Sequence, residues 1–186
     1  MIVTINSVDH SVLTQKTEQI HEDELPLACT IADKLFQALQ PYFPAAGLAA
    51  PQIGINKALF IYSYDRDPAH LQVVINPTYQ PIGNQMVIGW ESCLSVMASH
   101  GPWKVAKLAR YEKIKAHYKN LEGEEVDILL DGFAAKAFQH EYDHLQGIVN
   151  IYRKDAEIRV FETKESLFDF MQQVKKEDSL HYKNPS

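Results

Sequence analysis

The sequence has few cysteines, no excess of positive charge and no long apolar run. Two cysteines, Cys29 and Cys93, do not make the disulfide framework of a small secreted domain. The formal net charge is −6 and no long basic run occurs, so electrostatics give no support to nucleic-acid binding. No stretch is apolar enough to span a membrane, and the opening MIVTINSVDHSVLTQ lacks the basic-then-apolar pattern of a signal peptide. We therefore expect a cytoplasmic protein without membrane contact.

Length and periodicity predict one α+β domain. The 186 residues can bury a full core. Helices are expected at Glu24–Gln40, where Cys29 would be a small core residue, and at Thr163–Lys176. Strand patterns occupy residues 57–64, 72–75, 85–96, 113–118 and 126–130. We expect antiparallel or mixed sheets around a central helix in a domain of residues 1–177, followed by a polar, flexible tail at 178–186.

The segment FQHEYDHLQG, Phe138–Gly147, carries the clearest chemistry. His140 and His144 are four residues apart, so on a helix of about 3.6 residues per turn they share one face and can bind one metal ion. Glu141 is rotated by about 100° from His140, where a general base for a metal-bound water should lie. The same motif occurs by chance in surface helices. Here the surrounding residues are apolar, and histidines buried in such a helix need partners that a metal supplies.

A catalytic site of this kind needs a third protein ligand. Glu162 and Glu165 lie downstream at distances that suit a metalloprotease. Cys93, in the segment WESCLSV, lies upstream and would bind as a thiolate. The motif alone leaves both sources open.

Three segments, in this order along the chain, resemble the signatures of the peptide deformylase family. They are GLAAPQIG at Gly47–Gly54, ESCLS at Glu91–Ser95 and QHEYDH at Gln139–His144. The last predicted helix resembles the C-terminal helix of the bacterial type. The resemblance implies an enzyme that removes the N-formyl group from formyl-methionyl peptides of newly made proteins.

The resemblance implies that Cys93, His140 and His144 bind one divalent metal ion, natively Fe²⁺ and replaceable by Ni²⁺ or Zn²⁺. Glu141 would take a proton from the metal-bound water and pass it to the leaving amine. With Cys93 as the third ligand, Glu162 and Glu165 are better explained as solvated charges.

Five further residues take roles near the metal, the first four from the same resemblance. The Gln52 amide and the Leu94 backbone N–H would stabilise the oxyanion formed from the formyl group. Glu91 and Arg110 would pair beside the metal ligands, although a plain surface charge is an alternative for Arg110. Asp143 would orient a ligand imidazole or be solvated.

The substrate side departs from the family pattern. Residues implied to contact the substrate are Ala46, Gly47, Gly89, Ser92, Phe133, Lys136 and Ala137. Ala45 and Ser92 replace the glycines usual there, and Gly89 with Trp90 replaces residues near the methionine pocket. Lys136 occupies a normally apolar position of that pocket, one turn before His140. It either extends past an apolar wall to solvent or favours a carboxylate-bearing substrate.

The expected partner is an N-formylated peptide or nascent chain, with a contact to the ribosome as a further expectation. Three alternatives stay open: an amidase of the same type with another substrate, a peptide- or ribosome-binding protein without turnover, and an HExxH metalloprotease. An intact set of Gln52, Cys93, His140, Glu141 and His144 argues against loss of activity.

Overall fold

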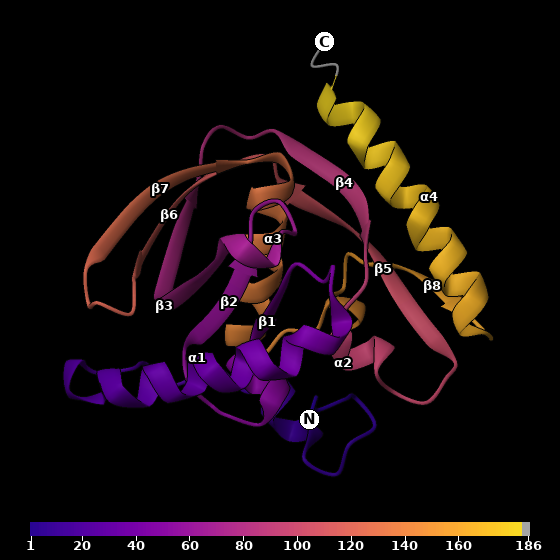
Figure 1. The fold of residues 1–186 in the computed structure, drawn as a ribbon. Coiled ribbons are helices and arrows are strands. Elements are labelled where there is room, and N and C mark those ends of the chain that lie inside the picture. The colour runs from indigo at the N-terminus through magenta and orange to yellow at the C-terminus, as the bar shows by residue number, and fades with distance from the viewer. Residues whose placement is uncertain (184–186) are drawn as a thin grey trace.

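A central helix lies between two antiparallel sheets (Figure 1). The computed structural model describes residues 1–183, with side chains through Lys176. The larger sheet has the strand order β1-β2-β3-β6-β7 and the smaller has the order β4-β5-β8. The strands are β1 (Gly47–Ala49), β2 (Leu59–Ser63), β3 (Leu71–Pro81), β4 (Met86–Glu91), β5 (Trp103–Tyr111), β6 (Lys113–Lys119), β7 (Glu125–Asp131) and β8 (Glu157–Phe161). The helices are α1 (Leu25–Leu39), α2 (Leu94–Met97), α3 (Gly132–Leu145) and α4 (Lys164–Lys183).

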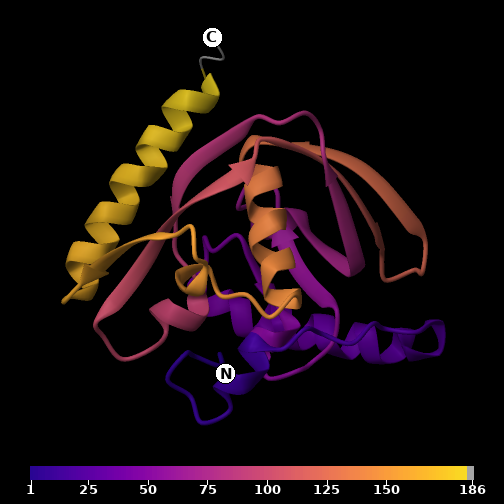
Figure 2. The same cartoon turned by 180° about the vertical axis from the view of Figure 1, so that it is seen from behind.

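Strand β2 is buried on both faces because helices cover it from both sides. Phe60 and Tyr62 pack against Phe138 of α3, whereas Leu59 and Ile61 face the apolar stripe of α1. Alternate residues of a strand point to opposite faces, which explains why this strand is continuously apolar. Figure 2 shows α3 on the face of the larger sheet opposite the face that α1 covers.

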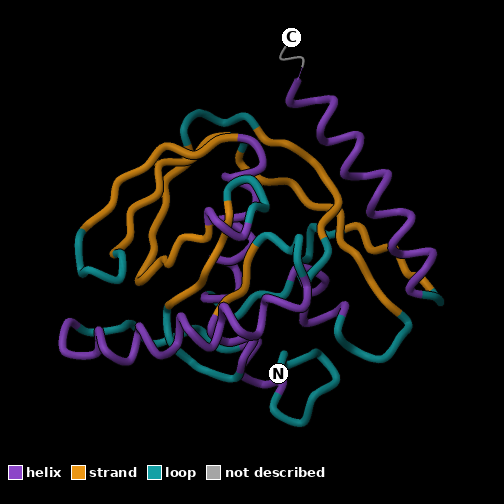
Figure 3. Tube along the Cα trace, in the orientation of Figure 1, coloured by secondary structure: helices purple, strands orange, loops and turns teal. Residues whose placement is uncertain are grey.

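Helix α4 packs against the smaller sheet through Leu167 and Phe170. Leu167 joins a cluster with Val105 and Phe161, and the rings of Phe170 and Trp90 meet edge to face at 5.3 Å. Figure 3 shows α4 as a long helix at the side of the molecule, apart from α1. None of the helices within residues 1–183 combines the length and the apolar character that a membrane span requires.

Most expected elements are present, with two changes at strands. The strand expected at 85–96 ends at Glu91, because the Cys93 carbonyl accepts the N–H groups of Val96 and Met97 and the chain turns into α2. The strand expected at 72–75 continues to Pro81 as β3, past an irregularity between Ile75 and Thr78. Pairing with β6 maintains that strand from Thr78 to Pro81, beyond its expected end.

The prediction that Cys29 is a core residue is wrong, because its side chain is exposed. Helix α1 buries Ala28, Ile31 and Leu35, and Cys29 is rotated by about 100° from Ala28. The expected tail at 178–186 falls partly within α4, which runs to Lys183, and residues 184–186 lie outside the described residues. The division into a domain and a tail stays a prediction.

Candidate metal centre and substrate cleft

The chain direction changes at both ends of helix α3. Asp131, the last residue of β7, is its N-cap residue, in extended conformation. Gly147 follows the helix with φ +73°, a left-handed conformation that ends α3 and that side chains rarely adopt. A Cβ atom at Gly147 would lie 2.7 Å from the Thr14 carbonyl carbon, so only glycine permits this approach to the N-terminal segment.

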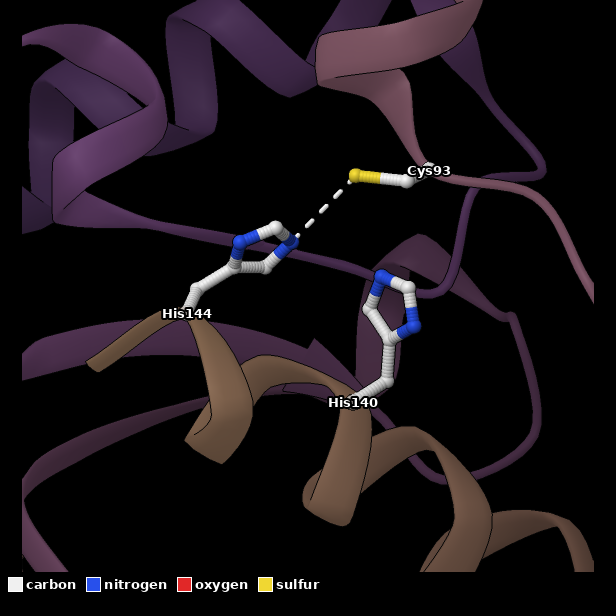
Figure 4. Close-up of side chains that lie close together, drawn as sticks. All are labelled: Cys93, His140 and His144. Carbon is white, nitrogen blue, oxygen red and sulfur yellow. Dashed lines mark hydrogen bonds between the residues drawn. The ribbon is translucent and has the colours of Figure 1, made fainter. Parts of the chain in front are cut away.

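Cys93, His140 and His144 form a compact cluster (Figure 4). Their ligand atoms lie within 4.8 Å of one another, and the Cys93 thiol is 3.3 Å from Nε2 of His144. Cys93 and His144 are buried, and His140 is half-buried. One soft sulfur and two imidazole nitrogens, converging in a site shielded from water, fit a single divalent metal ion.

A buried ion pair holds the His140 ring. Nδ1 of His140 lies 2.9 Å from Oε2 of Glu91, so its Nε2 is the nitrogen left for the cluster. Glu91 in turn accepts two hydrogen bonds, each of 2.9 Å, from the Arg110 guanidinium. Arg110 is only 3% exposed and is therefore not a surface charge. Its third contact is a 2.6 Å hydrogen bond to Asp143.

The charges around the cluster follow from this packing. Burial opposes ionisation of Glu91, yet hydrogen bonds and charge from Arg110, and then from His140, hold its pKa well below the usual range. Burial would lower the pKa of His140, but the hydrogen bonds with Cys93 and Glu91 raise it well above its usual value. Burial lowers the pKa of His144 well below its usual value.

Glu141 lies beside the cluster, and one of its carboxylate oxygens accepts no hydrogen bond from the described residues. Its side chain is buried, and among the described residues Oε2 has no hydrogen-bond partner. Burial raises its pKa to about 7, against the opposing positive charge of His140. A Cβ atom at Gly47 would lie 2.7 Å from Oε1 of Glu141, so glycine in strand β1 is what makes room for this carboxylate.

Gln52 reaches the same centre from the turn after β1. Its Oε1 accepts the Ala49 backbone N–H at 2.9 Å, which directs the amide nitrogen to the opposite side. That nitrogen is 3.6 Å from the Cys93 sulfur and donates to Ser95 Oγ at 3.2 Å. At 2% exposure, Gln52 is not an ordinary polar loop residue. Leu94 begins α2 directly after Cys93.

A cleft of about 590 Å³ opens onto these residues. Gln52, Leu94, His140 and Glu141 line its inner part. Of the residues expected to contact substrate, it is lined by Ala46, Gly47, Ser92, Phe133, Lys136 and Ala137.

Gly89 is the expected substrate residue that does not line the cleft; it contacts Lys136 instead. A Cβ atom at Gly89 would lie 2.9 Å from the Lys136 ammonium nitrogen, so a side chain there would crowd the lysine. The ammonium donates a hydrogen bond to the Trp90 carbonyl at 3.0 Å.

One expectation from the sequence needs correction. Asp143 does not orient an imidazole and is not solvated: it binds Arg110 and, at 3.2 Å, Arg153. Glu162 and Glu165 are exposed, as expected for solvated charges, and the cluster found in the described residues contains neither of them.

Sequence reasoning missed several residues that the fold brings to this site. Ser95 holds the Gln52 amide, and Asn150 donates to the Glu91 backbone carbonyl at 3.2 Å. Phe168 and Met171 of α4 line the cleft. Ser95 lies within the ESCLS segment and could have been found there, whereas the other three residues have no local sequence signal.

An α+β domain whose central helix presents HExxH to a buried cysteine has the arrangement of a metal-dependent hydrolase. Comparison with known proteins identifies the family. The sequence profile described as polypeptide deformylase matches residues 2–159. Peptide deformylase 2 of Ralstonia nicotianae is 32% identical over 156 residues, which cover 80% of this chain and 85% of that protein.

Solved structures agree with this match. The crystal structure of peptide deformylase from Thermotoga maritima has a TM-score of 0.69 at 31% identity, covering 82% of this chain and 95% of that one. A Met-Ala-Ser-bound class I type b peptide deformylase from Acinetobacter baumannii has a TM-score of 0.70 at 28% identity, covering 82% of this chain and 99% of that one. The chain belongs to the polypeptide deformylase family. The family, the α+β fold and the assignment as a deformylase enzyme, all predicted from the sequence, are confirmed.

Proposed function

We propose that this enzyme removes the N-formyl group from formyl-methionyl peptides of nascent chains in the cytoplasm, with Fe²⁺ as its native metal. The observation that supports it most directly is the buried Cys93, His140 and His144 cluster with the unpartnered Glu141 oxygen beside it. Cys93, His140 and His144 would hold the ion, which when bound there acidifies water and polarises a carbonyl group.

Glu141 moves the proton in this proposal. Its Oε2 atom is the acceptor for a proton from the attacking water, and the same carboxyl then donates that proton to the leaving amine. Gly47 leaves the space that this carboxylate needs, and burial keeps bulk water from competing for it. The reaction breaks one amide C–N bond and yields formate and a free N-terminus.

Gln52 and Leu94 are the proposed oxyanion donors. The hydrogen bond from the Ala49 backbone N–H to the Gln52 side-chain oxygen directs the Gln52 amide N–H₂ toward Cys93. The Leu94 backbone N–H follows Cys93 directly in the chain. Donors fixed before the reaction cost little reorganisation when charge develops on the formyl oxygen. Glu91 orients His140 through its hydrogen bond with Nδ1 of the ring, and Arg110 holds Glu91 in place.

Loaded with Fe²⁺ or Ni²⁺, the protein should release formate from formyl-Met-Ala-Ser in a steady-state assay. Acetyl-Met-Ala-Ser is the matched substrate that tests whether the acyl group matters. Faster release of acetate than of formate would assign a different acyl substrate, and release of neither group would sink the proposal. A contact with the ribosome belongs to the same proposal and would be measured by co-sedimentation.

Lys136 supports a second candidate, an amidase of the same type whose substrate does not begin with methionine. Its ammonium lies in the cleft wall, one turn before His140 and against Gly89. A cation in this wall makes the pocket less apolar, and therefore less suited to a buried thioether side chain.

Lys136→Ile should therefore raise kcat/KM for formyl-Met-Ala-Ser roughly tenfold, within the range that one apolar contact contributes to discrimination. Lys136→Met keeps the length of the side chain but removes the charge, so it separates the effect of charge from that of space. Unchanged kcat/KM in both variants would show that Lys136 does not determine specificity.

A further inference from the structure

Helix α4 supplies one wall of the cleft that opens onto the metal site. Six of its residues line that cleft: Lys164, Phe168, Met171, Gln172, Val174 and Lys175. Their spacing of mostly three or four positions places them along one side of the helix. The family profile matches residues 2–159, so α4 lies beyond the matched segment. This wall is therefore a feature that the present chain adds to the site of the matched segment.

The wall is held in place because α4 is anchored to the smaller sheet, along which it runs in Figure 1. Leu167 is fully buried, and the ring of Phe170 lies 5.2 Å from that of Phe161 in β8. Phe168 follows Leu167 directly and is turned by about 100° from it, so the packing of Leu167 keeps Phe168 on the cleft side. A side chain positioned before binding loses little freedom when a ligand arrives.

Phe168 is 62% exposed, although its ring is strongly apolar. Among the described residues with large exposed apolar side chains, Tyr42 and Phe168 are the two that line the cleft. A single exposed apolar residue on a convex surface needs no explanation. An aromatic ring that is left open inside a concave site, close to groups that bind and react, is instead the usual anchor for an apolar part of a ligand.

Apolar residues of the same cleft connect Phe168 with the metal site. Met97 of α2 and Met171 of α4 both pack against the cluster around Leu167, and both line the cleft. Leu94, which directly follows the proposed ligand Cys93, lines it as well. Methionine side chains adapt to ligands of different shape. A peptide with its formyl group at the metal site therefore has an apolar surface to follow toward α4.

The formylated residue itself has another place in the cleft. Lys136 and Ala137 belong to α3, within one turn of His140, and line the cleft next to the metal site. The metal cluster found in the described residues contains no residue of α4. We therefore expect α3 to contact the first side chain of a bound peptide and α4 to contact the residues that follow.

We propose that Phe168 and Met171 bind an apolar side chain in the residues that follow the formylated one, so that the enzyme favours N-formylated peptides that continue with apolar residues. This inference rests on the proposed deformylase function and adds the substrate class. The occupant is the substrate itself, because α4 and the metal site line one continuous cleft. Burial of an apolar side chain against the Phe168 ring removes apolar surface of both partners from water and requires no charge.

Two peptides of similar shape but different polarity test this: formyl-Met-Leu-Leu and formyl-Met-Asn-Asn. With the metal-loaded enzyme, kcat/KM should be roughly tenfold higher for the Leu peptide, within the range that apolar contacts contribute to discrimination. The ratio of the two values should change by less than about twofold when salt is raised to about 0.5 M, because salt screens charges and not apolar contacts. A ratio that collapses at high salt would assign the preference to charge and overturn the inference.

Phe168→Ala should remove most of the Leu-to-Asn ratio, whereas Phe168→Leu keeps an apolar side chain and should retain most of it. Tyr152→Ala is the matched control, because it removes an aromatic side chain that is 58% exposed and does not line the cleft. It should leave the ratio unchanged. Equal kcat/KM for the two peptides, or a Leu preference that persists in Phe168→Ala, would overturn the inference while the deformylase function stands. No formate from either peptide would overturn the proposed function itself.

Discussion

Replacing Glu141 by glutamine should lower kcat on formyl-Met-Ala-Ser by about 10² to 10⁴, the range for removal of a general acid–base group. Glutamine keeps the shape of the side chain but cannot accept the proton from water. The metal content should be unchanged, because the three proposed ligands remain in place. Steady-state kinetics with metal analysis of the same sample measures both quantities.

Glu165→Gln is the matched control, since Glu165 is exposed and does not line the cleft. Its kcat should equal that of the unchanged enzyme. If Glu141→Gln retained kcat within about threefold at full metal occupancy, Glu141 would not be the general base.

Replacing Cys93 by alanine should weaken metal binding by more than about 100-fold, the upper end for residues that only orient ligands. The thiolate would be the only sulfur ligand of the set, and two imidazoles alone leave the ion open to water. Metal content after dialysis against a weak chelator, measured by elemental analysis, tests the expectation without relying on activity.

Cys29→Ala provides the control, because Cys29 is an exposed cysteine outside the cluster. It should keep full occupancy. Full occupancy in Cys93→Ala would instead assign the third ligand elsewhere, and Glu162 and Glu165 would again be candidates. Circular dichroism of both variants separates loss of metal from loss of fold.

Local sequence patterns were enough to predict much of this fold. The strand expected at 113–118 is present as β6, and Ile114, Ala116 and Tyr118 form its buried face. The helix expected at Glu24–Gln40 is present as α1, and only the burial of Cys29 was predicted wrongly. Such patterns work because the period of a helix or strand is a local property of the backbone.

The strand expected at 85–96 shows where local patterns fail. Its apolar character continues past Glu91, but Cys93 turns the chain through hydrogen bonds to its own carbonyl. Likewise β3 continues past Pro77 only because β6 pairs with it. Both outcomes depend on hydrogen bonds that have no periodic signature.

The sequence by itself determined the candidate metal ligands and general base: two histidines four residues apart with a glutamate between them, and a cysteine in a recognisable segment. Helical geometry places such residues on one face without help from the rest of the chain. Only the tertiary structure decided that Arg110 is buried, that Asp143 binds two arginines, and that α4 lines the cleft. Those contacts join residues far apart in the chain, so they depend on how the two sheets and α4 pack around α3.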